Sequence, residues 1–237
     1  MPERFIFRQF YYKDLARFLE DGEIRAKNHP TLQACHQTSY QQIVNRRGTA
    51  EFQLPGGGVV NDCVPFYFSP VTSFTYTIHQ GNVPLVSPNG VTLGQAKSDE
   101  RVFIVFKTEA FRNSNLEYYF SDYALNSMAP LPSIETDLGK LAQHVHWNVF
   151  DEAPYVAAIP EVGYQGVCQY FKSMTSPPTR QLRSQKRMAE FLIKTAVPLN
   201  LACCLIAKSA AISDKLHEMM AASHWEIPIF VKPGCYF

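Results

Sequence analysis

Three residues of this chain are best suited to chemistry: the neighbouring arginines Arg46 and Arg47, and the distant Glu190. A guanidinium group binds phosphate through two parallel hydrogen bonds. A fixed carboxylate can stabilise the positive charge that develops when a glycosidic bond breaks. Together these residue types suggest an enzyme that handles a nucleotide. Spacing alone favours a simpler interpretation, in which the arginines cap the end of a helix and the glutamate faces solvent at a strand end.

The segment that follows the arginines adds a glycine turn and an aromatic strand. Residues 55–58 read Pro-Gly-Gly-Gly, which lets the backbone turn sharply or approach a ligand closely. Residues 64–68 read Val-Pro-Phe-Tyr-Phe and could form the wall of a pocket for a flat ring. None of these features is specific by itself.

A second candidate region is the irregular segment 151–187, in which prolines and glycines interrupt every periodic pattern. Long irregular segments are often functional, and cations interleaved with aromatic residues are what a single-strand binder uses for phosphate contacts and base stacking. From spacing alone a solvated loop is the favoured alternative. The residues concerned are Tyr164, Tyr170, Phe171, Lys172, Arg180, Arg183, Lys186 and Arg187.

Composition limits the class of protein. A chain of 237 residues with 46% hydrophobic content can bury a sizeable core, and we expect one domain that spans residues 1–237. The formal net charge is +1, so overall attraction to nucleic acid is weak and binding would need a local basic patch. The charge neither requires nor excludes a nucleic-acid partner.

Targeting signals and cysteine spacing indicate a cytoplasmic protein. The first fifteen residues carry charges and lack a signal-peptide core, and the apolar run 197–207 is too short to span a membrane. The six cysteines show neither CxxC spacing nor a regular framework, which favours free thiols in a reducing compartment. We expect no metal site and no membrane association.

Periodicity predicts a mixture of helices and strands that would position these residues. Arg46 and Arg47 should follow a helix, and Glu190 should lie in a strand. The expected helices are 12–22, with Asp14 as a possible cap and Gly22 at its end, then 32–44, 138–148 and 212–222. The expected strands are 4–10, 59–68, 74–78, 101–107, 118–120, 186–193, 197–207 and 227–232.

These motifs together resemble the DarT toxin family, NAD-dependent ADP-ribosyltransferases that modify bases in DNA. The family's two arginines, Pro/Gly-rich turn and D-x-V-P-F-Y-F strand are similar to Arg46-Arg47, residues 55–58 and residues 62–68. Its K-R-x-A-E-F-L strand is similar to residues 186–192. The resemblance runs almost from end to end. It implies an α+β fold: a split, mostly antiparallel sheet of the ADP-ribosyltransferase type with N-terminal helices and a long substrate loop before Glu190.

The resemblance also implies roles for individual residues. Glu190 would be the catalytic carboxylate, Arg47 would bind the pyrophosphate or stabilise charge near the target base, and Arg46 would support it more weakly. Tyr67, Phe74 and Tyr76 would line the nicotinamide pocket, although alternating aromatic residues on a strand are more often core. Near the N-terminus the chain departs from the family's I-x-H-I-T strand and following asparagine. It carries Arg8, Gln9 and Asp14 there instead, and we expect these to contact NAD.

The function that the resemblance implies is transfer of ADP-ribose from NAD to a base in single-stranded DNA. Such an enzyme would act as a toxin in a toxin–antitoxin or phage-defence system, with an antitoxin that removes ADP-ribose through a macrodomain or binds the toxin directly. The same chemistry on RNA is an alternative, and a catalytically silent nucleic-acid-binding module is a more distant one. Thymine and guanine are the leading target bases, and the sequence leaves the choice between them open.

Overall fold

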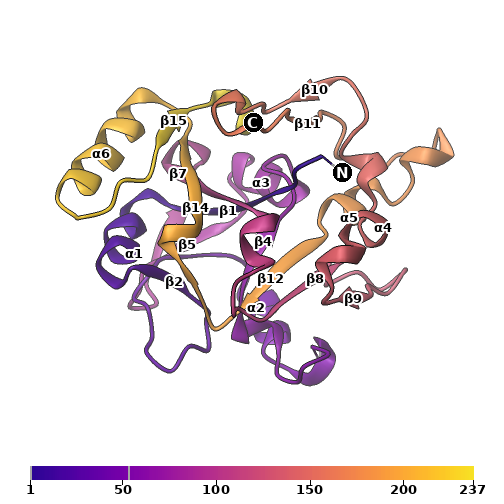
Figure 1. Ribbon diagram of the computed structural model, residues 1–237, viewed down its shortest axis with the longest axis horizontal. Helices are drawn as coiled ribbons and strands as arrows, with labels where there is room; N and C mark the ends of the chain where they lie inside the picture. Colours follow the sequence, from indigo (N-terminus) through magenta and orange to yellow (C-terminus); the bar gives the residue numbers. More distant parts are fainter. Residues whose placement is uncertain (1, 53) are drawn as a thin grey trace.

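The computed structural model describes residues 2–52 and 54–237, and its centre is an eight-stranded sheet (Figure 1). Neighbouring strands run antiparallel except β14 and β15, which are parallel. In spatial order the strands are β15 (Ile229–Val231), β14 (Ala202–Ala207), β7 (Arg101–Lys107), β1 (Phe5–Tyr11), β4 (Cys63–Tyr67), β12 (Glu190–Lys194), β8 (Tyr118–Ser121) and β9 (Ile134–Glu135).

The sheet divides between β1 and β4. Strand β1 pairs with β7 along its whole length, whereas it shares with β4 the single register pair Phe7 and Tyr67. Strands β7 and β14 therefore lie in one half of Figure 1, and β4, β12 and β8 lie in the other. The expected α+β fold with a split, mostly antiparallel sheet is confirmed.

Six α-helices are found in the described part of the chain, and they surround the sheet. Helices α1 (Leu15–Asp21) and α6 (Ala210–Ala221) contact each other beside the β14 half, and α1 ends at Gly22, whose φ of 72° is left-handed. Helix α2 (Gln41–Arg47) leads into the glycine turn, and α3 (Ser73–His79) follows β4. Helices α4 (Leu141–His144) and α5 (Arg183–Arg187) flank the β12 half. Within residues 2–52 and 54–237, no helix is long and apolar enough to cross a membrane.

The described residues also form three small sheets. Strand β2 (Glu23–Arg25) pairs with β13 (Ala196–Pro198), and β10 (Tyr155–Val156) pairs with β11 (Val167–Cys168). The third comprises β3 (Gln37–Thr38), β5 (Pro84–Val86) and β6 (Thr92–Gln95). The first of these sheets joins the N-terminal segment to the chain that follows β12.

Several expected elements differ in type or length. Residues 74–78, predicted as a strand, belong to helix α3, because Thr72 and Thr75 form reciprocal capping bonds at its start. The helix expected over 32–44 begins only at Gln41, and the strand expected from residue 59 begins at Cys63 after a 3-10 turn (Val60–Asp62). Segment 138–148 forms the short helix α4 between 3-10 turns, and 186–193 is helical up to Arg187 before β12 begins.

Candidate active site

Glu190 is the first residue of β12, and the sheet buries it to 3% exposure. It lies opposite Tyr67 of β4, and its backbone N–H donates to the hydroxyl of Ser121 at 2.9 Å. Side chains alternate along a strand, so Glu190 shares a face with Leu192. That face carries a small apolar core of Leu54, Val60, Cys63, Tyr119, Leu125 and Leu192. Glu190 thus stands at the margin of an apolar layer that restricts water around its carboxylate.

Arg47 reaches the same carboxylate from the last residue of α2. Its Nη2 donates to both carboxylate oxygens of Glu190. Burial raises the pKa of Glu190, and the positive charge of Arg47 opposes that rise. Burial acts to lower the pKa of Arg47, but the charge of Glu190 raises it overall. The structure therefore brings together the two residues that the sequence indicated as catalytic, 143 positions apart.

Polar side chains of β1 and the following turn lie beside this pair. Arg8 donates a hydrogen bond to the carbonyl of Pro65 at 3.1 Å. Burial lowers the pKa of Arg8, and the positive charge of the nearby Arg47 lowers it further. Two buried atoms on β1, Arg8 Nε and Gln9 Oε1, have no hydrogen-bond partner among the described residues. Buried donors and acceptors normally have a partner. Neighbouring residues of a strand point to opposite faces of the sheet, so the two atoms lie on different faces of β1. Arg8, whose charge acts on both Arg47 and Glu190, is the one placed to bind a polar ligand such as a phosphate beside the pair.

Asp14 does not cap helix α1 through its side chain. It is 4% exposed and accepts hydrogen bonds from the backbone N–H of His36 at 3.1 Å and from its Nδ1 at 2.7 Å. Burial raises the pKa of Asp14, and the bonds from His36 oppose this. Sequence analysis missed His36, because it lies in an irregular segment and its pairing with Asp14 arises from tertiary structure.

The expected nicotinamide residues divide between two places. Tyr67 and Phe74 lie together, with ring centroids 6.4 Å apart. Tyr76 instead packs against Phe171 at 5.4 Å and Phe237 at 5.2 Å. Residues two positions apart on a helix point to opposite sides, so the helical state of α3 separates Tyr76 from the other two rings. These contacts do not support the prediction that Tyr76 lines a nicotinamide pocket together with Tyr67 and Phe74, and that role stays a prediction.

Arg46 makes no hydrogen bond or ion pair with Glu190 among the described residues. Its side chain forms an ion pair with Glu51 at 2.5 Å and lies over the ring of Phe52 at 5.4 Å. Because the side chain is 41% exposed, it contributes to the surface around the arginine pair. Of the two arginines, Arg47 is the one that contacts the carboxylate of Glu190.

Four of the expected nucleic-acid contacts are buried, and these assignments need correction. Arg183 and Arg187 are 1% and 0% exposed, and their guanidinium groups donate mainly to backbone carbonyls. Tyr164 and Phe171 are each 8% exposed, and Tyr164 packs on Phe5 at 5.3 Å. Side chains enclosed in this way cannot reach phosphates or stack on bases. They hold the loop in place.

The other four residues remain accessible on the loop or near it. Tyr170 is 36% exposed, and the guanidinium of Arg180 lies 4.2 Å from its ring centroid. Lys172 is exposed, with Nζ 4.1 Å from the ring of Tyr76, and Lys186 is half-buried. An exposed aromatic ring with cations beside it is suited to a base and its phosphates.

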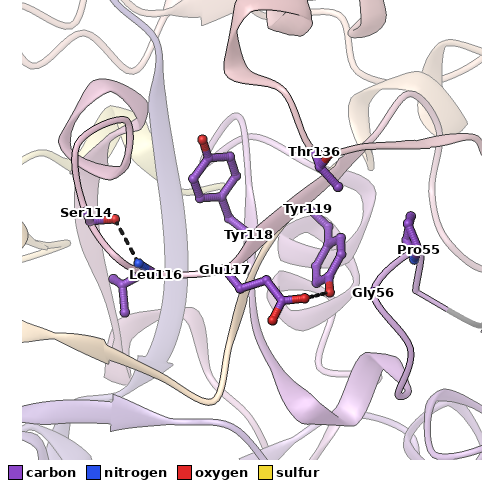
Figure 2. A pocket seen from close by; sticks show the side chains of 8 residues that line it. All are labelled: Pro55, Gly56, Ser114, Leu116, Glu117, Tyr118, Tyr119 and Thr136. Atoms are coloured by element: carbon purple, nitrogen blue, oxygen red, sulfur yellow. Dashed lines mark hydrogen bonds between the residues drawn. The ribbon is translucent and has the colours of Figure 1, made fainter.

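The glycine turn packs against β8 and does not enclose the Glu190 pair. Figure 2 shows the hollow of about 480 Å³ that it borders, with Glu117 and the hydrogen-bonded hydroxyl of Tyr119 directed toward Gly56. A Cβ at Gly56 would lie 2.5 Å from both groups, so a larger residue there would require these two side chains to move. None of the residues nominated for catalysis or for NAD lines this hollow. Among residues 2–52 and 54–237, no cluster of His, Cys, Asp and Glu is arranged for a metal ion.

Known proteins share the sequence pattern and the fold of this chain. A curated DNA ADP-ribosyl transferase of Thermus sp. (strain 2.9) is 26% identical over 214 residues, which cover 90% of this chain and 83% of the relative. The solved structure of Thermus sp. 2.9 DarT with ADP-ribosylated ssDNA has a TM-score of 0.75 at 22% identity and covers 99% of this chain and 96% of that one. The same protein in complex with NAD+ has a TM-score of 0.69 at 20% identity, covering 99% and 98%.

A second relative is larger. Thermosipho africanus DarTG, solved in complex with ADP-ribose, has a TM-score of 0.63 at 14% identity and covers 100% of this chain but 51% of its own. These solved structures share the fold. A family model described as "ssDNA thymidine ADP-ribosyltransferase, DarT" matches residues 12–237. The chain therefore belongs to the DarT family and is an NAD-dependent ADP-ribosyltransferase.

Proposed function

We propose that this protein transfers ADP-ribose from NAD to a thymine base in single-stranded DNA, with Glu190 and Arg47 as its catalytic residues. The observation that carries the proposal is the contact between Arg47 and both carboxylate oxygens of the buried Glu190. The family description supports thymidine as the target. The Thermus relative's complex with ADP-ribosylated ssDNA supports a single-stranded polymer.

Each residue has a physical task in this proposal. When NAD binds, Glu190 lies beside the ribose, and its carboxylate stabilises the positive charge that develops as the bond to nicotinamide breaks. It can also accept the proton of the attacking base nitrogen. Arg47 holds the carboxylate in one orientation and offers its remaining donors to a phosphate. Arg8, Gln9 and Asp14 form the polar side of the NAD site, and Tyr67 and Phe74 form its aromatic side.

The target strand would approach along the exposed part of the loop before α5. Tyr170 provides a ring on which a base can stack, and Arg180, Lys172 and Lys186 provide positive charge for the phosphates. A base must leave its stack before its nitrogen can reach the ribose, which favours single-stranded substrates.

A DNA-modifying enzyme of this kind damages the cell that makes it, and we therefore propose a toxin role in a toxin–antitoxin or phage-defence system. The DarTG relative, about twice the length of this chain, supports an antitoxin partner that opposes the modification. We propose the cytoplasm as its place of action, since NAD and single-stranded DNA meet there.

Mass spectrometry of nucleosides tests the substrate. The protein is incubated with NAD and matched DNA or RNA oligonucleotides, and Glu190→Gln is the control. We expect an ADP-ribosylated thymidine from the DNA sample and none from the control. A product from RNA alone would replace DNA as the substrate, and no product from either polymer would favour a catalytically silent module.

A further inference from the structure

Arg187 is a fully buried cation for which no acidic partner is found among the described residues. It is 0% exposed, and its guanidinium lies 5.1 Å from the ring centroid of Phe150. Burial lowers its pKa to about 10. A buried charge without a counter-charge is unfavourable, and an apolar side chain of similar volume is often as stable or more so. Stability alone therefore does not explain an arginine at this position.

The geometry of the guanidinium indicates what the charge is used for. Nη1 donates to the carbonyls of Val149 at 3.0 Å and Cys168 at 2.8 Å. Nη2 donates to the hydroxyl of Ser69 at 3.0 Å and to the carbonyl of Val71 at 2.7 Å. The planar fork of arginine can connect several acceptors at fixed angles, which the ammonium group of lysine cannot do in the same way.

The four acceptors belong to parts of the chain that surround the candidate site. Ser69 and Val71 form the turn that joins β4 to α3, between Tyr67 and Phe74. Cys168 ends β11, directly before the segment 169–182 that leads to α5 and is called the target loop below. Val149 ends the 3-10 turn after α4. Arg187 itself ends α5, three residues before Glu190. One side chain thus links the NAD side, the target loop and the catalytic strand.

Arg183 supports the same arrangement one helical turn earlier. Its Nη1 donates to the carbonyls of Val149 at 3.3 Å and Tyr170 at 3.1 Å, and its Nη2 pairs with Glu152. Both arginines therefore hold the loop, but Arg187 alone among the two also contacts the turn after β4. That difference makes Arg187 the connection between the two substrate sides.

We infer that Arg187 is a positioning residue that keeps the target loop and the turn after β4 aligned with Glu190, so that cleaved ADP-ribose passes to the base and not to water. This inference rests on the proposed function. Loosening Arg187 should alter the partition between transfer and NAD hydrolysis, because hydrolysis needs Glu190 and NAD but no aligned base.

The first test compares Arg187→Lys with the wild-type protein. Lysine keeps the charge and loses the fork, so we expect the ratio of DNA modification to NAD hydrolysis to fall at least tenfold. The control is Arg112→Lys, whose side chain is 45% exposed and pairs with Glu109 at the surface; its ratio should remain that of the wild type. An unchanged ratio in Arg187→Lys, with any loss of the two activities in parallel, would overturn the inference.

Ser69 provides a second test if Arg187→Lys does not fold. Ser69→Ala removes one acceptor on the turn after β4 and leaves the arginine in place, so we expect a ratio about threefold lower, with Ser69→Thr restoring it. An unchanged ratio in Ser69→Ala would count against the inference.

Hydrogen exchange separates this inference from the proposed function. If the wild-type protein modifies no oligonucleotide, the proposed function fails, and exchange still tests the connection. Arg187→Lys, or Ser69→Ala where that variant does not fold, should accelerate exchange in the turn 68–72 and in the segment 165–172 together, relative to Arg112→Lys. Unchanged exchange in either segment would refute the connection.

Discussion

The buried ion pair between Arg47 and Glu190 allows a prediction about stability as well as catalysis. In Arg47→Met the Glu190 carboxylate, 3% exposed, would lose the guanidinium that binds both of its oxygens. Leaving one member of a buried pair uncompensated typically destabilises a protein by about 3–5 kcal/mol. This is a large share of the roughly 5–15 kcal/mol that stabilises an ordinary domain. Arg47→Met should therefore shift urea unfolding strongly.

Adding Glu190→Gln to Arg47→Met should recover part of that loss, because the buried charge disappears. The remaining cost is that of a buried amide without full hydrogen bonding, about 1–3 kcal/mol. The double variant should thus be more stable than Arg47→Met alone, and the coupling should exceed the few tenths of a kcal/mol found for independent sites. Glutamine is preferred over alanine here, since alanine would also remove the packing of the side chain at position 190.

Urea unfolding of the wild type, both single variants and the double variant measures this coupling. Modification activity should fall by at least about 100-fold in all three variants, since each lacks a group that acts on transition-state charge. If the two substitutions were additive in stability, or if Arg47→Met unfolded at the wild-type urea concentration, the pair would not contribute as the structure indicates.

Three further predictions concern the target loop and pH. Tyr170→Ala should weaken oligonucleotide binding by about 1–3 kcal/mol, measured by fluorescence anisotropy, because a stacking ring is lost. Phe171→Ala should instead lower the free energy of unfolding in urea by about 3–5 kcal/mol, because the ring of Phe171 is buried. Arg180→Gln should reduce the salt dependence of binding by about one phosphate contact and leave NAD affinity unchanged; an unchanged salt slope would exclude that contact. Burial raises the pKa of Glu190, and the ionised carboxylate is the active form. As the pH is lowered, kcat/KM for NAD hydrolysis should therefore begin to decline above the ordinary glutamate pKa of about 4.3. A decline centred at that ordinary value would contradict the burial effect.

The sequence alone was sufficient for the family, and it also indicated Arg47 and Glu190, whose catalytic role remains a proposal. Arg47 lies in a local motif with the glycine turn, and Glu190 lies in a motif with its own strand, so each is recognisable from neighbours in the chain. The strand 101–107 was equally clear, since a run of β-branched and aromatic residues matches a strand buried on both faces. Local patterns of this kind depend on residues a few positions apart.

Tertiary structure decided which side chains are available to a ligand. Arg183 and Arg187 have the same composition signal as Arg180, but contacts with Val149, 34 and 38 positions away, enclose the first two. Tyr76 contacts Phe171 and Phe237 and not the ring of Phe74, because the capping bonds at the start of α3 make a helix of a segment whose alternating pattern predicted a strand.

Whether a side chain is buried, and which residue it contacts, depends on segments that are distant in the chain. The pairing of Asp14 with His36 and of Glu190 with Arg47 joins segments 22 and 143 positions apart. A single sequence records the type and order of such residues. It does not record which of them fold against one another, because that depends on how the whole sheet and its loops pack.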